Sequence, residues 1–314
     1  MRGLVAVFRK ELADHFGSKR FVILFALIFL TALSATYVAS QSIRDDIASS
    51  DAQSTFVFLR LFTASTGTLP PFIAFISFLG PLVGLALGFD AINSEQARGT
   101  LSRILSQPVY RDSVINGKFL AGIVTVGVMI FAIGLIVVGI GLRLLGLPPT
   151  LDEINRMLSF LALSVLYVAF WMSLSILFSI LFRQMATSAL AGIAVWIFCT
   201  FFVAMIAGVL ADAIVPITDP DDGPAIVMND QAARMISRIS PTTLYQEVTM
   251  TILTPNLRSF GPMLMKDVIG MVSSPLALAQ SLLIVWPQLI GLVALTSICF
   301  AVSYVRFMRQ EIRA

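Results

Sequence analysis

Few side chains in this sequence could carry out chemistry. The chain of 314 residues has one histidine, His15, which precedes the first long apolar stretch, so a histidine-based dyad or an HExxH zinc site within a membrane span is excluded. Gly117 and Lys118 match the end of a phosphate-binding loop, but Phe119 replaces its Ser or Thr and Asp112 replaces its first glycine. We therefore expect that this chain does not hydrolyse ATP by itself.

Asp90 is the one carboxylate near the middle or end of an apolar stretch, and the sequence suggests no partner for it. A membrane-embedded aspartyl protease needs two such groups. Proton- and ion-driven carriers keep several ionisable residues inside the bilayer, whereas these stretches hold almost none away from their ends. Any driving energy is therefore expected to come from another protein.

The elements that must position these residues are membrane helices. Hydrophobic residues make up 57% of the chain and charged residues 12%, with a mean hydropathy of +0.91. Soluble domains carry about 25% charged residues, so a soluble enzyme, a disordered protein and a disulfide scaffold are excluded. A bilayer core needs about 20 apolar residues in helical form. The stretches that meet this requirement are 21–40, 72–91, 119–142, 158–182, 186–211 and 282–305.

The distribution of basic residues predicts that both termini are cytoplasmic. With the N-terminus inside, thirteen of the 21 Lys and Arg residues fall in the inner segments, and most loop acidic residues fall outside. The net charge of +3 is too small to indicate a nucleic-acid binder. Cys199 and Cys299 lie within apolar stretches and are expected to be packing residues without a disulfide.

The first twenty residues predict an amphipathic helix at the inner membrane surface. Its apolar face comprises Leu4, Val5, Phe8, Leu12 and Phe16 at helical spacing, and its charged residues, Glu11 among them, fall largely elsewhere. Two interpretations stay open. The helix is either a simple interfacial anchor or a lever that passes motion from a cytoplasmic partner to the first span.

The inner loop 92–118 is the second informative segment. A short helix is predicted over 100–106, where Leu101, Ile104 and Leu105 share a face, and Pro108 ends it. A second helix then begins near Arg111 and runs into the third span. An apolar face between basic residues suits docking into the groove of a partner, and the alternative is an ordinary solvated loop.

This loop and the N-terminus resemble a known family. The run from Glu95 through Gly99 and Pro108 to Lys118 resembles the E-x-x-x-G-T-L-x-x-L-L-S-x-P-V-x-R-x-x-x-x-x-G-K loop of ABC-2 type transporter permeases, with Ile104 as a conservative departure. The Phe8-Arg9-Lys10-Glu11-Leu12 start is similar to the charged connecting helix of that family. The motifs cover about 50 residues, and the layout of six spans covers the whole chain as one domain, 1–314.

The resemblance implies a type V exporter-like, all-α membrane fold in the cell membrane. It also implies two separate ATPase subunits, which bind ATP and Mg²⁺, and a second permease copy as a homodimer partner. Glu95 would cap or pair with basic neighbours at the cytoplasmic end of the second span, and Gly99 would permit the turn into a coupling helix. The coupling role would fall on Glu95, Arg98, Gly99, Thr100, Leu101, Arg103, Leu105, Pro108 and Arg111. The connecting helix would comprise Phe8, Arg9, Lys10, Glu11 and Leu12.

Two other features leave alternatives open. The third span holds five glycines that permit close helix approach or bending, or serve as filler. The segment 212–281, expected to be external, holds six of the 13 methionines. They suit packing of an external cap or Cu(I) binding, and one branch of the family, the permeases of nitrous-oxide-reductase maturation, serves a copper enzyme. The glycines are Gly122, Gly127, Gly134, Gly139 and Gly141.

The function expected from the sequence is therefore that of a transport subunit, with an exporter as the favoured direction. The rival is a non-transporting membrane assembly or anchoring protein whose outer segment holds a partner. Nothing in the sequence identifies a substrate.

Overall fold

The computed structural model describes residues 2–48, 56–65, 70–100, 110–217, 219, 222–256 and 275–310, and every regular element in these ranges is a helix. The N-terminal half contains α1 (Arg2–Gly17), α2 (Lys19–Ala48), α3 (Arg60–Thr63), α4 (Phe72–Gly88), α5 (Asn93–Ala97) and α7 (Arg111–Leu145). The C-terminal half contains α8 (Leu151–Leu181), α9 (Met185–Ile197), the π-helical turn η1 (Phe198–Phe202), α10 (Val203–Ile214), α11 (Gly223–Ser237), α12 (Pro241–Leu253), α14 (Leu278–Ile284) and α15 (Trp286–Arg309).

Six helices in the described ranges are long and apolar enough to cross a bilayer, which confirms the six predicted spans. They are α2, α4 continued through α5, α7, α8, the continuous α9–η1–α10 and α15. Several run beyond the predicted apolar stretches, and α7 begins at Arg111, as the sequence indicated. Hydropathy marks only the part of a helix that lies in lipid, whereas the backbone hydrogen bonds continue into polar turns.

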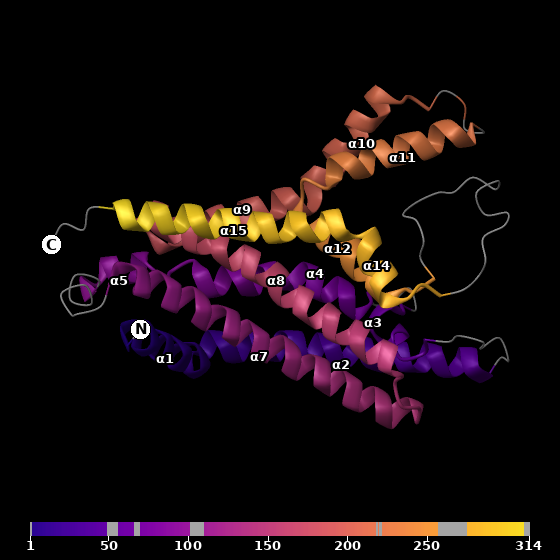
Figure 1. Ribbon diagram of the computed structural model, residues 1–314, viewed down its shortest axis with the longest axis horizontal. Helices are drawn as coiled ribbons and strands as arrows, with labels where there is room; N and C mark the ends of the chain where they lie inside the picture. The colour runs from indigo at the N-terminus through magenta and orange to yellow at the C-terminus, as the bar shows by residue number, and fades with distance from the viewer. Residues whose placement is uncertain are drawn as a thin grey trace.

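The spans form one elongated bundle, with α8 at its centre (Figure 1). α8 packs against α4, α7, α12 and α15, and its Phe160, Tyr167 and Trp171 are fully buried. α2, α9–η1–α10 and α15 expose most of their apolar side chains. The inner helices therefore provide the core, and the outer ones provide the lipid-facing surface.

Glycines bring α4 and α8 into backbone contact. Gly80, Gly84 and Gly88 recur every four residues and so share one face of α4. A Cβ atom on Gly84 would lie 2.6 Å from the carbonyl oxygen of Val168, and one on Gly88 would lie 2.8 Å from that of Met172. Only hydrogen fits at these positions, so the two helices pack more closely than larger side chains would permit.

The glycines of the third span divide into two groups. Gly122, Gly134 and Gly141 face side chains of neighbouring elements at close range, whereas Gly127 and Gly139 face open space. The first three therefore make room for neighbouring side chains, and the last two have no neighbour within 4 Å to accommodate.

Both ends of the described chain lie at the same end of the bundle (Figure 1). α1 crosses the start of α7, and Arg111 donates a hydrogen bond of 3.0 Å from Nη1 to the carbonyl oxygen of Gln310 just after α15. Ser18 ends α1 and starts α2, because its hydroxyl accepts a hydrogen bond from the backbone N–H of Phe21. Ser18 therefore separates α1 from the helix of the first span.

The segment 212–281 is not a uniform external cap. α10 and α11 form a hairpin that projects away from the bundle (Figure 1), whereas α12 packs inside it, with Tyr245 and Ile252 fully buried. Two of its methionines in the described ranges, Met228 and Met235, lie on α11 and are exposed, so they do not pack as the sequence suggested. Met250 on α12 is also exposed, and Met263, Met265 and Met271 lie outside the described residues.

Candidate functional site

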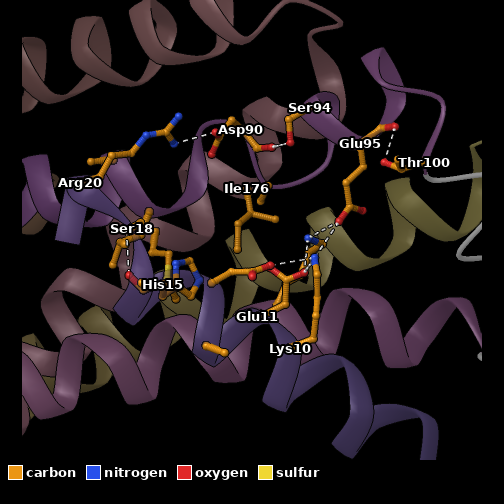
Figure 2. Close-up of a pocket in the computed structure, with 18 of the residues that line it drawn as sticks. Lys10, Glu11, His15, Ser18, Arg20, Asp90, Ser94, Glu95, Thr100 and Ile176 are labelled. Atoms are coloured by element: carbon orange, nitrogen blue, oxygen red, sulfur yellow. Dashed lines mark hydrogen bonds and ion pairs between the residues drawn. The ribbon is translucent and has the colours of Figure 1, made fainter.

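A buried lysine joins three elements at the end of the bundle that carries α1. Lys118 of α7 has a side chain that is 7% exposed, and its Nζ lies 2.8 Å from Oε1 of Glu11 on α1 and 2.9 Å from Oε1 of Glu95 on α5. Lys10 lies outside this centre, 2.8 Å from Glu11 and 3.7 Å from Glu95. We call these four residues the Lys118 cluster, and Figure 2 labels three of them, Lys10, Glu11 and Glu95.

The packing of α1 on α7 explains why Glu11 points inward. Val7 and Glu11 are one helical turn apart on the face of α1 that meets α7. Gly117 allows the close approach, because a Cβ atom there would lie 2.7 Å from Cγ1 of Val7. The sequence placed Glu11 away from the packing face, and this was wrong. The pattern of α1 alone cannot show that a lysine on another helix receives its carboxylate.

Glu11 and Lys10 stay ionised at neutral pH. Burial raises the pKa of Glu11, but the charges and hydrogen bonds of Lys118 and Lys10 lower it more, so the pKa lies below its ordinary value of 4.5. Burial lowers the pKa of Lys10, yet its bonds to Glu11 and Asp14 and the charge of Glu95 raise it above its ordinary value. The joint pairs two acidic side chains with two basic ones.

A second ion pair lies beside the cluster. Nη1 of Arg20 on α2 lies 2.6 Å from Oδ2 of Asp90, which follows α4, and the Arg20 guanidinium sits 5.0 Å from the ring centre of Phe89. Asp90 therefore has a partner, contrary to the sequence-based expectation. The pairing depends on the turn at Ser18, which brings the start of the first span against the end of the second.

These charged groups line one cleft of about 940 Å³ between α1, the start of α2 and the segment 86–100 (Figure 2). Basic, acidic and imidazole side chains alternate around it. Ion pairs between these side chains hold the surrounding helices together. Positive and negative charges are nearly balanced in the cleft, so it does not concentrate a highly charged ligand. The arrangement is suited to transmit force between helices.

The other predicted coupling residues lie around this cleft or outside the described residues. Gly99 has a φ of 65°, a left-handed conformation that fits a glycine ending a helix, and Thr100 donates to the carbonyl oxygen of Glu95 at 3.2 Å. Arg98 is exposed, and Arg111 bonds to the end of α15. Leu101, Arg103, Leu105 and Pro108 lie outside the described residues. In α1, Phe8 and Leu12 are half-buried and Arg9 is exposed.

The sequence-based site omitted Lys118, Arg20 and Asp90. A signal for Lys118 was present, because a lysine among apolar residues where a span begins calls for a counter-ion. Glu95 was expected to pair with basic neighbours, and the structure confirms that pairing.

Acidification is expected to loosen α1 from the bundle. His15 lines the cleft, and burial is the largest influence on its pKa, which it lowers. The negative charges of Glu11, Asp14 and Asp90 raise this pKa, and the positive charge of Lys118 lowers it. The pKa of His15 therefore lies below its ordinary value of 6.5. The unfolded chain then binds this proton more readily than the folded protein. Stability is therefore fully present above about pH 6.5 and declines as the pH falls below it.

Hydrogen exchange of α1 measures this effect. Protection factors for α1 amides are expected to fall between about pH 7.5 and about pH 5.5 after correction for intrinsic exchange. His15→Gln is the matched control and should flatten the dependence in this range, because Glu11 titrates only at lower pH. Equal pH dependence in both proteins would contradict the role of His15.

Comparison with known proteins assigns the family. The model of a family described as ABC-2 family transporter protein matches residues 5–312. The chain belongs to the ABC-2 family of transporter proteins. This ABC-2 protein is a multi-pass membrane protein, and in a bacterium that membrane is the cell membrane.

Two relatives are described as probable permeases. The protein is 39% identical over 59 residues to NosY of Pseudomonas aeruginosa, described as a probable ABC transporter permease protein, and 37% identical over 59 residues to NosY of Stutzerimonas stutzeri. Each alignment spans 19% of this chain, and 22% and 21% of the respective relatives. The similarity is therefore local, whereas the family match covers nearly the whole chain.

Proposed function

We propose that this ABC-2 protein is the permease of an ABC exporter and that the Lys118 cluster couples it to a separate ATPase. The observation that carries the proposal is the position of Lys118, which bonds α1 and α5 at once from inside a spanning helix. A force on either element would therefore reach α7 directly. The permease description of the two NosY relatives supports the transport assignment.

The proposed mechanism relies on rigid elements. Two ATPase subunits bind ATP and Mg²⁺, and each docks on the segment 95–111 of one permease copy. Their closure pushes on this segment and on α1, and the ion pairs of the Lys118 cluster pass the movement to α7. A second permease copy completes the pathway, and substrate crosses between the two copies. The chain itself contributes docking, coupling and the transmembrane path.

Reconstitution with a Walker-type ATPase sought in the neighbouring reading frames tests the proposal. The two proteins are expected to purify as a complex whose ATP hydrolysis is stimulated by substrate, identified from a panel of lipids, hydrophobic drugs, peptides and ions. A complex that forms without any stimulation across the panel would favour an assembly or anchoring protein. Failure to bind any Walker-type ATPase would contradict the permease assignment.

Replacing Leu101 and Leu105 with Asp is expected to detach the ATPase. Two carboxylates on the predicted docking face would have to be buried without partners, which costs several kcal/mol, an estimated hundredfold loss of affinity or more. Co-purification of the ATPase measures the effect. Leu147→Asp with Leu151→Asp is the matched control, because both leucines are exposed at the opposite end of the bundle, the first between α7 and α8 and the second at the start of α8. Recovery of the complex equal to the control would contradict the docking role.

A further inference from the structure

A groove on the lipid-facing side of the bundle combines an apolar trough with a polar end. It is about 490 Å³ in volume and lies between α12 and the first half of α15. The other end of α15 is the one that lies at the end of the bundle carrying α1 (Figure 1). Ile239 and Leu244 form one wall, and Gly291, Ala294 and Ile298 of α15 form the other. The small residues leave the trough open, since Gly291 has no side chain to fill it.

The polar end is built around Glu247. Its Oε2 accepts hydrogen bonds from Nε of Arg238 at 2.9 Å and from Nε2 of Gln288 at 2.8 Å. Glu247 and Gln288 are buried, and Arg238 is half-buried. The ion pair is neutral as a whole, so the polar end carries no net charge.

Two hydrogen-bonding groups at the polar end of the groove have no partner among the described residues. Oε1 of Gln288 has no hydrogen-bond partner among the described residues, although the side chain is only 4% exposed and lines the groove. The Nη groups of Arg238 likewise have no acceptor among the described residues. A buried amide oxygen without a donor is costly, and a guanidinium edge prefers a phosphate or carboxylate. The groove therefore offers one site for an anion and one for an N–H or O–H donor.

The position of the groove relative to the membrane fits an amphiphile. Trp286 begins α15 and is exposed, and tryptophan favours the membrane–water interface. Gln288 lies about half a helical turn after Trp286 along α15, whereas the stretch from Gly291 to Ile298 lies deeper in the membrane. Beyond the groove, Val302 and Val305 continue an exposed apolar surface along α15. The polar end thus lies at headgroup level and the trough extends into the hydrocarbon layer.

We propose that this groove binds a phospholipid-like amphiphile whose headgroup carries both a phosphate and a primary ammonium. The phosphate oxygens accept hydrogen bonds from the Nη groups of Arg238, and the ammonium donates a hydrogen bond to Oε1 of Gln288. An acyl chain fills the trough. A zwitterionic headgroup keeps the neutral Arg238–Glu247 pair neutral overall. A choline headgroup lacks the N–H donor, so it leaves Gln288 unpaired, and a purely anionic headgroup adds an unbalanced negative charge beside Glu247.

Lipid retention by the purified protein tests the proposal. The protein is placed in nanodiscs of equal phosphatidylethanolamine and phosphatidylcholine, extracted into mild detergent and analysed by native mass spectrometry. Wild type is expected to retain phosphatidylethanolamine over phosphatidylcholine. Arg238→Gln and Gly291→Leu are each expected to lower its retention about tenfold, equivalent to about 1.4 kcal/mol.

Gly127→Leu is the matched control, because Gly127 lies in a span and faces open space. Equal retention of the two lipids by wild type, or undiminished retention in both groove variants, would overturn the proposal. A change in oligomeric state in both groove variants without a change in lipid retention would also overturn it, because it would identify a second copy of the chain as the occupant.

A second arm distinguishes a resident lipid from cargo. Movement of a fluorescent phosphatidylethanolamine analogue is measured in proteoliposomes that also contain the ATPase. ATP-dependent movement that Arg238→Gln abolishes would identify the bound amphiphile as cargo. Retention without such movement would identify it as a resident lipid. Binding in the groove does not depend on ATP coupling, so this proposal can hold even where the proposed function fails.

Discussion

Replacing Lys118 with methionine is expected to destabilise the joint between α1, α5 and α7 by about 3–5 kcal/mol, because it leaves buried carboxylates without their counter-ion. Glu11 and Glu95 are both buried, and each lies within 2.9 Å of the ammonium. Lys10 still reaches Glu11, which places the expected loss toward the lower end of this range. Methionine has a similar length and shape, so the change removes charge with little change in packing.

The unfolding transition of the purified protein and the exchange protection of α1 measure this loss. Lys10→Met is the control, because the Lys10 side chain is 55% exposed and its ion pairs are screened by solvent, so a loss below about 1 kcal/mol is expected. Equal stability of wild type and Lys118→Met would show that the buried charge is not needed to hold the joint together.

Neutralising all three buried charges separates stability from coupling. The variant Glu11→Gln, Glu95→Gln and Lys118→Met removes both carboxylates together with the ammonium, so stability is expected to return to within about 1–2 kcal/mol of wild type. If the ion pairs transmit force, stimulated ATP hydrolysis by the complex stays low in this variant even though α1 is docked. Full recovery of both stability and stimulation would mean that packing alone couples the helices.

The spans could be predicted from the sequence because lipid imposes a simple requirement. About 20 apolar residues must follow one another, and six stretches in this chain meet that condition. The amphipathic α1 and the start of α7 near Arg111 were also predictable from local patterns. The position of α12 was not, because its thirteen residues are too short to span the bilayer and their burial depends on α8 and α15.

The candidate site could be predicted only in part. Glu95 and Gly99 belong to a local motif, and the structure confirms the basic partner of the first and the left-handed backbone of the second. The inward position of Glu11 and the Arg20–Asp90 pair depend on how α1 and α2 meet distant helices. Such contacts join residues far apart in the chain, and no local pattern encodes them.

The same distinction applies to the glycines. The sequence drew attention to the third span, where glycines are frequent, yet two of those five face open space. The tightest contact with backbone atoms involves Gly84 of α4, which faces α8. The number of glycines in a helix does not reveal which of them meets a neighbour, because that depends on the orientation of the helix.

Replacing Gly84 with alanine is therefore expected to force α4 and α8 apart and to cost about 1–3 kcal/mol. The new methyl group would lie 2.6 Å from the carbonyl oxygen of Val168 and 2.8 Å from the backbone nitrogen of Met172, and backbone atoms cannot rotate away as a side chain can. The unfolding midpoint in detergent should fall. Gly127→Ala is the matched control and should be neutral or slightly stabilising, because alanine favours a helix over glycine. A midpoint for Gly84→Ala that matches or exceeds that of Gly127→Ala would contradict the backbone contact between α4 and α8.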